Sequence, residues 1–182
     1  MLLAAWGRIH AARPNAHLVL VGRDEFSDDP EARSYLERHL AALDRSAKAN
    51  LHRTGVRDDA ERYLRAADLL LFPSRREGFG SAIIEAMACG LPCIVAELPG
   101  ITDLIFGCPA PTALEPAGDG IVVPQEDPKA IAGAALALLS APQQAASIGL
   151  KARARVEAKF GFDSITAAYL EFYAELLARG KR

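Results

Sequence analysis

The sequence predicts an α/β domain with a doubly wound parallel sheet, and three patterns support this prediction. Short apolar runs of strand length alternate with helical segments along the chain of 182 residues. The run 17–22 is almost continuously apolar, which is typical of a parallel strand covered on both faces. Between 69 and 96, a strand, a glycine loop, a helix and a second strand form one βαβ unit. Such sheets bind ligands outside the carboxyl ends of their strands.

The elements before this unit follow from apolar spacing and from breakers. Leu2, Leu3, Trp6 and Ile9 repeat at helical spacing, so we expect a helix over 2–12. The further elements expected are a strand at 17–22, a charged helix at 31–47 opened by Asp29-Pro30, a strand at 51–54 and a helix from Asp58-Asp59 to Ala66.

The βαβ unit contributes a strand at 69–72, a loop at 73–80, a helix at 81–89 and a strand at 93–96. After it we expect a helix at 101–106, an irregular stretch at 107–117, a strand within 118–124, a helix opened by Asp127-Pro128, a second helix to about Lys159, and a last helix capped by Asp163 or Ser164. We therefore expect four loops at the carboxyl edge, at 22–29, 55–58, 73–80 and 97–102.

The bulk composition excludes several classes of protein. A net charge of −2 argues against nucleic acid or an anionic membrane as the main partner. No run of eighteen apolar residues is found, so no transmembrane helix is expected, and the N-terminus lacks the pattern of a signal peptide. Three cysteines without a signal indicate a cytoplasmic protein.

A metal site is not expected from the sequence. Cys89 and Cys93 are separated by a Gly-Leu-Pro turn, and no second Cys/His pair follows at zinc-finger spacing. The pair Asp28-Asp29 is explained by the start of a helix. The four histidines are scattered, with no acid or nucleophile at motif spacing, so none is a convincing general base.

The loop that precedes the helix at 81–89 has the composition of a phosphate site. Gly78 and Gly80 flank Phe79, and glycines allow a ligand to approach main-chain N–H groups closely. The helix N-terminus adds unpaired N–H donors and a partial positive charge. Ser81 can cap the helix or donate its hydroxyl to the same phosphate. A simple tight turn remains the alternative for the glycines.

A second carboxylate lies within this helix. The neighbours of Glu85 are apolar, so most of the helix is expected to be buried and the carboxylate to need a partner. Ser81 and Glu85 are one turn apart and share a face. A ribose diol would satisfy Glu85, and a salt bridge to Arg75 or Arg76 is the alternative.

The string EGFGSAIIEAMACGLPCIVA at 77–96 resembles the E-x7-E motif of retaining glycosyltransferases with the GT-B fold, above all those of family 4. The flanking strings AADLLLFPS, PGITDLI and GDGIVVPQEDPKAIAGAA are similar to that family in order and spacing. The resemblance covers nearly the whole chain. It implies that 1–182 is a single Rossmann-like domain, the C-terminal nucleotide-sugar-binding half of a GT-B enzyme.

The resemblance also implies roles for individual residues. Glu77 would accept hydrogen bonds from hydroxyls of the donor sugar and is the candidate catalytic residue. Main-chain donors would hold the sugar and its phosphates around Gly78, Phe79 and Gly80, and the diphosphate at Ser81, Ala82, Ile83 and Ile84. Glu85 would bind the ribose. The base would be held at Gly55, Val56 and Arg57. No metal or cofactor is implied, and the nucleotide diphosphate sugar is a substrate.

The sequence also departs from the family pattern. The family carries a Gly-Arg and a Lys-Gly pair just before the first helix of this chain, and those cations stabilise the leaving diphosphate. Because this sequence begins in or just before that helix, we expect it to lack the pair, the first strand of the sheet and the N-terminal acceptor domain. Ile101 and Asp103 replace a Gly and a Glu that are common in the family.

We therefore expect the donor-binding half of a retaining enzyme that transfers a hexosyl group to an acceptor hydroxyl, with weak or absent transfer by this chain alone. The acceptor half would be a missing domain or a separate chain, and any peripheral membrane association would come through that half. Two alternatives remain, a non-catalytic module that pairs with an acceptor chain and a GT-B epimerase or phosphorylase-type enzyme. The last helix resembles the family's closing helix, and its aromatic face is expected to be exposed.

Overall fold

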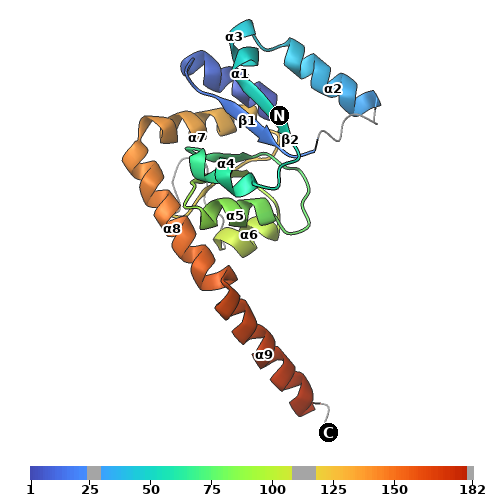
Figure 1. Cartoon of the computed structure of the whole chain (residues 1–182), viewed down its shortest axis with the longest axis vertical. Helices are drawn as coiled ribbons and strands as arrows, with labels where there is room; N and C mark the ends of the chain where they lie inside the picture. The colour runs from blue at the N-terminus through green and yellow to red at the C-terminus, as the bar shows by residue number, and fades with distance from the viewer. Residues whose placement is uncertain (24–29, 108–117, 180–182) are drawn as a thin grey trace.

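The computed structural model describes residues 1–23, 30–107 and 118–179, and it confirms the alternation of strands and helices (Figure 1). The strands are β1 (Leu18–Val21), β2 (Leu51–Gly55), β3 (Leu70–Phe72), β4 (Cys93–Ala96) and β5 (Ile121–Val123). The helices are α1 (Leu2–Ala12), α2 (Pro30–Ala41), α3 (Arg45–Ala49), α4 (Ala60–Ala66), α5 (Ser81–Ala88), α6 (Ile101–Phe106), α7 (Pro128–Ser140), α8 (Pro142–Phe160) and α9 (Phe162–Arg179).

The described strands form two parallel sheets rather than one continuous sheet. β1 pairs with β2, and β4 lies between β3 and β5. No described strand is hydrogen-bonded to both sheets. In the doubly wound order 3-2-1-4-5-6, the first strand pairs with both halves of the sheet. The order β2-β1 and β3-β4-β5 corresponds to that arrangement without its first strand, in agreement with the fold predicted from the sequence.

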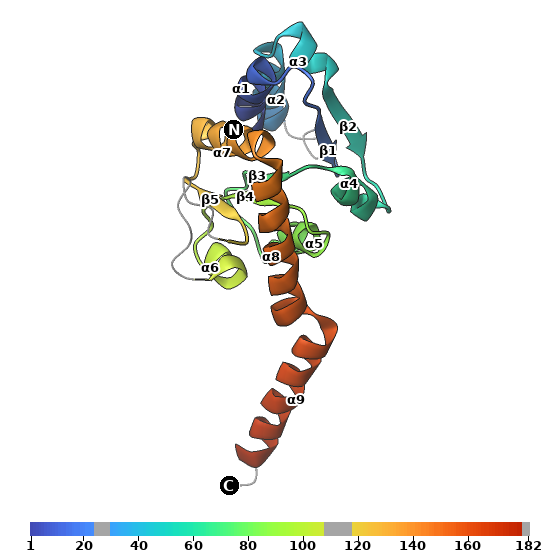
Figure 2. The same ribbon diagram turned by 90° about the vertical axis from the view of Figure 1, so that its left-hand side faces the viewer.

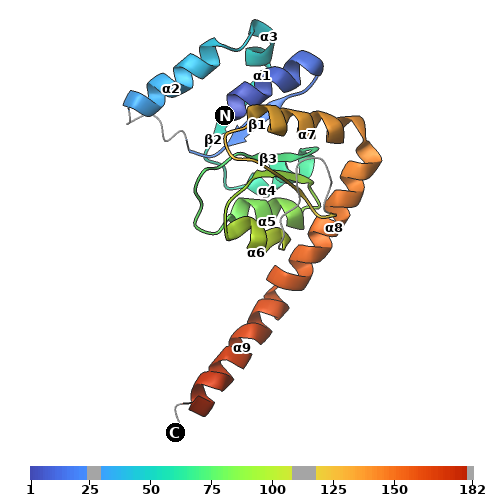
Figure 3. The same cartoon turned by 180° about the vertical axis from the view of Figure 1, so that it is seen from behind.

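The three-stranded sheet is covered by helices on both faces, as predicted. One hydrophobic cluster joins Ile94 of β4 and residues of β5 to α1 and α7, which pack side by side (Figure 3). The second cluster joins Cys93 and Val95 of β4 to α5 and α8. Because successive strand residues point to opposite faces, the apolar run of β4 contributes to both clusters. All four residues of β4 are buried.

Among the described residues, the two-stranded sheet is covered on one face only, so the prediction that 17–22 is buried on both faces is wrong. Leu18 and Leu51 pack against the first cluster. Val19 and Val21 point the other way and are 42% and 39% exposed. Both faces of this strand are therefore apolar, but in the described structure other elements cover only one of them.

The helix predicted at 31–47 is two helices, α2 and α3. The Asp44 side chain accepts a hydrogen bond from the Ala47 backbone N–H at 2.6 Å and caps α3. This bond and a hydrogen bond from Ser46 lower the pKa of Asp44. An Asp side chain can bind backbone N–H groups that would otherwise bond within a helix, so Asp is favoured at a helix start. Asp44 therefore begins α3, and the predicted single helix is divided.

The predicted N-terminal cap is confirmed at α7 and is wrong at α9. At α7, the Asp127 side chain accepts from the backbone N–H groups of Lys129 and Ala130, and Pro128 is the first helical residue, as predicted. The last helix begins at Phe162, so Asp163 and Ser164 lie inside its first turn and the predicted caps are wrong. The predicted end of the preceding helix near Lys159 is confirmed, because α8 ends at Phe160.

The helix α9 extends away from the body of the molecule (Figure 2). No residue of α9 is buried. Its exposed large apolar side chains are Phe162, Ile165, Tyr169, Leu170, Phe172, Tyr173, Leu176 and Leu177. The predicted exposure of this aromatic face is confirmed.

Some predictions fall outside the described residues. These are the loop carrying Asp28 and Asp29 and all but the first residue of the irregular stretch predicted at 107–117. Among the described residues no single helix has the length and apolar composition of a membrane span, and one bent combination, α7 with α8 and α9, passes on length and composition.

Candidate functional site

Three loops at the carboxyl edge of the three-stranded sheet are joined by side chains. These loops follow β3, β4 and β5. Gln125 Nε2 donates a hydrogen bond to the Glu97 carbonyl oxygen at 2.6 Å, which joins the loop after β5 to the loop after β4. Arg75 Nη1 lies 3.2 Å from Glu126 Oε1, which joins the loop after β5 to the loop after β3. The glycine loop at 73–80 is therefore held from a neighbouring loop.

The glycine loop ends in a backbone conformation that favours glycine. Gly80 has φ 80° and is the N-cap of α5. A Cβ atom at this position would lie 3.2 Å from Ile83 Cδ1 and 3.3 Å from Ile101 Cγ2. The tight turn and the close approach of helix to loop therefore both depend on Gly80. The turn at Gly80 presents the start of α5.

The backbone N–H groups at the start of α5 are free to bind a ligand. Ser81 is the first helical residue, and α5 has no side-chain cap, so the prediction that Ser81 caps the helix is wrong. Within the described structure, the N–H groups of Ser81 and Ala82 have no hydrogen-bond acceptor. Unpaired donors at a helix N-terminus are the groups that bind phosphate.

Glu85 is exposed, so the prediction that burial forces it to take a partner is wrong. The apolar neighbours Ile83, Ala86 and Met87 are fully buried on the opposite face of α5. Ser81 and Glu85 lie on the exposed face, one turn apart. The chain offers Glu85 no salt bridge among the described residues, and Arg75 is paired with Glu126 instead.

Glu77 is exposed on the glycine loop, and no described side chain forms an ion pair or hydrogen bond with its carboxylate. The site therefore combines unpaired N–H donors with two accessible carboxylates. Donors of this kind bind anionic oxygens, and carboxylates accept from hydroxyl groups. Such a combination suits a ligand that carries both phosphate and sugar.

An apolar groove lies next to this loop. It has a volume of about 550 Å³ and is lined by Phe160, Phe162, Ile165, Thr166, Tyr169, Leu170 and Tyr173 at the junction of α8 and α9. Phe79 of the glycine loop contacts Phe160 edge-on, with ring centroids 6.2 Å apart. The groove lining is mostly apolar and has no charged side chain, so it is not the phosphate site.

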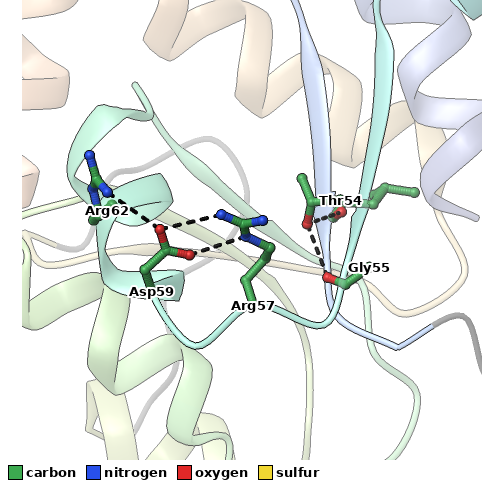
Figure 4. Close-up of polar contacts among 6 residues, drawn as sticks. Thr54, Gly55, Arg57, Asp59 and Arg62 are labelled. Carbon is green, nitrogen blue, oxygen red and sulfur yellow. Dashed lines mark hydrogen bonds and ion pairs between the residues drawn. The ribbon is translucent and has the colours of Figure 1, made fainter.

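The second group of predicted residues lies at the carboxyl end of β2 (Figure 4). Gly55 has φ 70°, and its carbonyl oxygen accepts hydrogen bonds from the Gly22 N–H at 3.0 Å and from Thr54 Oγ1 at 3.0 Å. The bond from Gly22, and a bond from Thr54 Oγ1 to the Leu20 carbonyl oxygen at 3.3 Å, join the ends of β1 and β2. Val56 is exposed beyond this turn. Gly55 thus ends β2 of the two-stranded sheet and Val56 and Arg57 follow it, whereas 77–85 follows β3 of the three-stranded sheet.

The guanidinium of Arg57 is held by its neighbours. Arg57 Nε lies 3.1 Å from Asp59 Oδ1, and Arg62 Nη1 lies 3.6 Å from Asp59 Oδ2 (Figure 4). Arg57 Cζ also lies 5.7 Å from the centroid of the Tyr63 ring. The hydrogen bond to Asp59 raises the pKa of Arg57. The sequence analysis missed Asp59 and Tyr63 as neighbours of Arg57, although their short spacing after Arg57 was a usable signal.

The described residues contain no group of three or more His, Cys, Asp or Glu side chains that could hold a metal ion. Cys93 is fully buried, and burial raises the pKa of its thiol well above the ordinary range. His17 Nδ1 lies 3.0 Å from His52 Nε2, but these residues lie at the amino ends of β1 and β2, at the edge opposite the candidate site.

Known proteins resemble this chain in sequence. The family model for glycosyl transferases group 1 matches residues 1–141. The D-inositol 3-phosphate glycosyltransferase of Streptomyces bingchenggensis is 36% identical over 127 residues, which cover 70% of this chain and 26% of that protein. The chain thus spans about a quarter of the length of this relative.

Solved structures show the same fold. Sucrose-phosphate synthase of Thermosynechococcus elongatus has a TM-score of 0.74 and 28% identity, covering 98% of this chain and 43% of that one. Anabaena HepE, solved in complex with UDP-glucose, has a TM-score of 0.78 and 23% identity, covering 96% of this chain and 44% of that one. The structural likeness confirms a Rossmann-like half of a GT-B fold.

Proposed function

Because the chain belongs to the glycosyl transferases group 1 family, we propose that it is the donor-binding half of a retaining glycosyltransferase. The complete enzyme would transfer a hexosyl group from a nucleotide diphosphate sugar to an acceptor hydroxyl. The observation that carries the proposal is the start of α5. There, unpaired N–H groups of Ser81 and Ala82 follow a positive-φ glycine and stand near two accessible carboxylates on the same loop and helix.

Each group has a role in this proposal. The N–H groups at Gly78–Ala82 bind the diphosphate and stabilise the charge that develops on it as the glycosidic bond breaks. Glu77 accepts hydrogen bonds from sugar hydroxyls and fixes the anomeric carbon relative to the acceptor. Glu85, one turn into the helix, accepts from the ribose hydroxyls. The loop at 55–57 holds the base.

Catalysis would consist of electrostatic stabilisation of the leaving diphosphate and positioning of the sugar, with no metal ion or cofactor. The relatives reported above are longer than this chain. In the D-inositol 3-phosphate glycosyltransferase, the matched segment covers 26% of the protein. We therefore propose that this chain binds the donor, that transfer also requires an acceptor half in the same or another chain, and that any contact with a membrane is made through that half. The proposed compartment is the cytoplasm.

Calorimetric titration tests this function directly. The purified chain is titrated with UDP-glucose, GDP-mannose, ADP-glucose and the free nucleotides at up to millimolar concentration. Saturable binding of at least one nucleotide sugar is the expected result. If none of these ligands binds at millimolar concentration, the donor-binding function is wrong for this chain. A transfer assay with the acceptor half added then separates an enzyme from a non-catalytic binding module.

A further inference from the structure

Phe79 connects the glycine loop to the end of α8, which is distant in the sequence. Its ring meets the Phe160 ring edge-on, with centroids 6.2 Å apart and an angle of 79° between the ring planes. This geometry is a favoured one for two aromatic rings. Residues 75–79 of the loop are all exposed, and Phe79 itself is 51% exposed. The contact with Phe160 therefore gives an otherwise exposed part of the loop a tertiary partner.

Phe160 is held in place by α8. It is the last residue of this helix, and it follows Ala152 and Val156 at intervals of one helical turn. Ala152 and Val156 are buried in the second hydrophobic cluster, and Phe160 packs against the same cluster. This cluster also contains the buried residues of α5, and α8 packs against α5. The core that fixes α5 therefore also fixes the Phe160 ring.

The rest of the glycine loop is held unevenly. Arg75 is joined to Glu126 by an exposed ion pair, which contributes little to stability. A Cβ atom at Gly78 would meet nothing within 4 Å, so the chain there is open to solvent. Gly78 and Gly80 flank Phe79, and glycine loses more backbone freedom on ordering than any other residue. A contact that fixes Phe79 therefore also orders the peptide groups on either side of it.

We propose that Phe160 is a positioning residue for the glycine loop, and that its contact with Phe79 holds the backbone N–H groups of 78–82 in the orientation that binds a diphosphate. This inference rests on the proposed function, which places the diphosphate at these N–H groups. Phe160 acts only through Phe79. Donors that are ordered before the ligand arrives bind it more tightly, because less entropy is lost on binding. Removal of the Phe160 ring should therefore loosen the free loop and weaken diphosphate binding.

Calorimetric titration of the purified chain with UDP, GDP and ADP measures the effect on binding. Phe160→Leu keeps an apolar side chain against the cluster and removes the ring. We expect it to weaken the binding of the tightest of these nucleotides by about three- to tenfold, the range for one aromatic contact. Phe160→Tyr keeps the ring and should retain wild-type affinity. Phe79→Leu should lose as much as Phe160→Leu, and the double variant no more than either, because all three remove the same contact.

Limited trypsin digestion measures the order of the loop in the absence of nucleotide. Cleavage after Arg75 and Arg76 requires local opening of the loop. Mass spectrometry gives its initial rate relative to cleavage after Arg38 of α2 in the same digest. Phe160→Leu and Phe79→Leu should each raise this relative rate by about three- to tenfold, and Phe160→Tyr should leave it at the wild-type value.

Phe162→Leu is the matched control. Phe162 lines the same groove two residues after Phe160 and is 85% exposed, so both measurements should keep their wild-type values. If a nucleotide binds but Phe160→Leu retains the wild-type affinity or the wild-type cleavage rate, the inference is wrong while donor binding stands. Losses that multiply in the double variant, or a loss in Phe162→Leu equal to that in Phe160→Leu, would also contradict it. If wild type binds no nucleotide, the proposed function fails and the inference fails with it.

Discussion

Arg75 Nη1 and Glu126 Oε1 lie 3.2 Å apart and connect the loop after β3 to the loop after β5. Glu126 is the one described residue other than glycine with positive φ, at 58°. A side chain in this region costs about 1 to 2 kcal/mol relative to glycine. An exposed ion pair contributes only about 0 to 1 kcal/mol. The strain at Glu126 therefore exceeds what the ion pair returns, and strained residues of this kind gather at functional sites.

Glu126→Gly is predicted to be more stable than Glu126→Ala by about 1 kcal/mol, because both variants remove the ion pair and only the glycine removes the backbone strain. Urea denaturation followed by circular dichroism measures the difference. Arg75→Ala, which removes the pair and leaves the strain, is the control and should lose no more than about 1 kcal/mol. Equal stability of the two Glu126 variants would show that the backbone at this position is not strained.

Gly80→Ala is predicted to destabilise the fold by about 1 to 3 kcal/mol. The new Cβ atom would lie 3.2 Å from Ile83 Cδ1, and the residue would have to keep φ near 80°. Gly78→Ala is the matched change two residues earlier, where a Cβ atom meets nothing within 4 Å and φ is not positive. It should change the free energy of unfolding by less than about 0.5 kcal/mol. Similar losses in both variants would contradict the tight turn at Gly80.

Glu85→Ala is predicted to weaken the binding of a free nucleotide more than Glu77→Ala does, because we assign Glu85 to the ribose and Glu77 to the sugar. Both carboxylates are exposed and have no described ion-pair partner, so neither change should disturb the fold. Calorimetry with the free nucleotide and with the nucleotide sugar separates the two roles. Glu37→Ala, an exposed carboxylate on α2, serves as the control. Wild-type affinity of Glu85→Ala for free nucleotide would exclude the ribose assignment.

The pH dependence of stability should carry a contribution from Asp119. Burial raises the pKa of Asp119 above its ordinary value of 3.8, and Arg155, whose Nε lies 3.2 Å from Asp119 Oδ2, opposes this shift. The folded state then binds the proton more tightly than the unfolded chain does. The stabilisation is complete below pH 3.8 and is lost as the pH rises through the raised pKa.

Asp119→Asn removes this titration. Among the described residues Asp119 Oδ1 has no hydrogen-bond partner, which is consistent with a carboxyl that is costly to ionise. The stability of the Asn variant relative to wild type should therefore rise between about pH 3 and about pH 7 in chemical denaturation. A relative stability that stays constant over this range would mean that Asp119 titrates with its ordinary pKa.

Apart from the division of 31–47 into α2 and α3, the sequence predicted the element order, because apolar runs, Asp-Pro pairs and glycines act locally. The βαβ unit, the glycine loop and the cap at Asp127 follow from such signals. The sheet could not be predicted in full. Whether Val19 and Val21 are covered depends on which elements pack against β1. Because every residue of β1 is apolar, the sequence cannot indicate which face of the strand is exposed.

The error at Glu85 has a similar origin. The apolar neighbours of Glu85 predict a mostly buried helix, but Ala82 and Ala88 are small enough to lie on an exposed face beside Glu85. The ion pair between Arg75 and Glu126 joins residues 51 positions apart, and only the tertiary structure brings them together. In contrast, the arrangement of Arg57, Asp59 and Tyr63 lies within one loop and one helical turn, and sequence spacing could have indicated it.

Amide hydrogen exchange with and without a saturating nucleotide sugar tests the central claim most directly, because the proposed contacts are made largely by backbone N–H groups. The ligand is the nucleotide sugar that binds most tightly in the calorimetric panel. We predict slower exchange at 78–84 and at 55–57, with no change at the opposite edge around His17 and His52. Binding without protection at 78–84, or with protection confined to the groove between α8 and α9, would contradict the donor site described above.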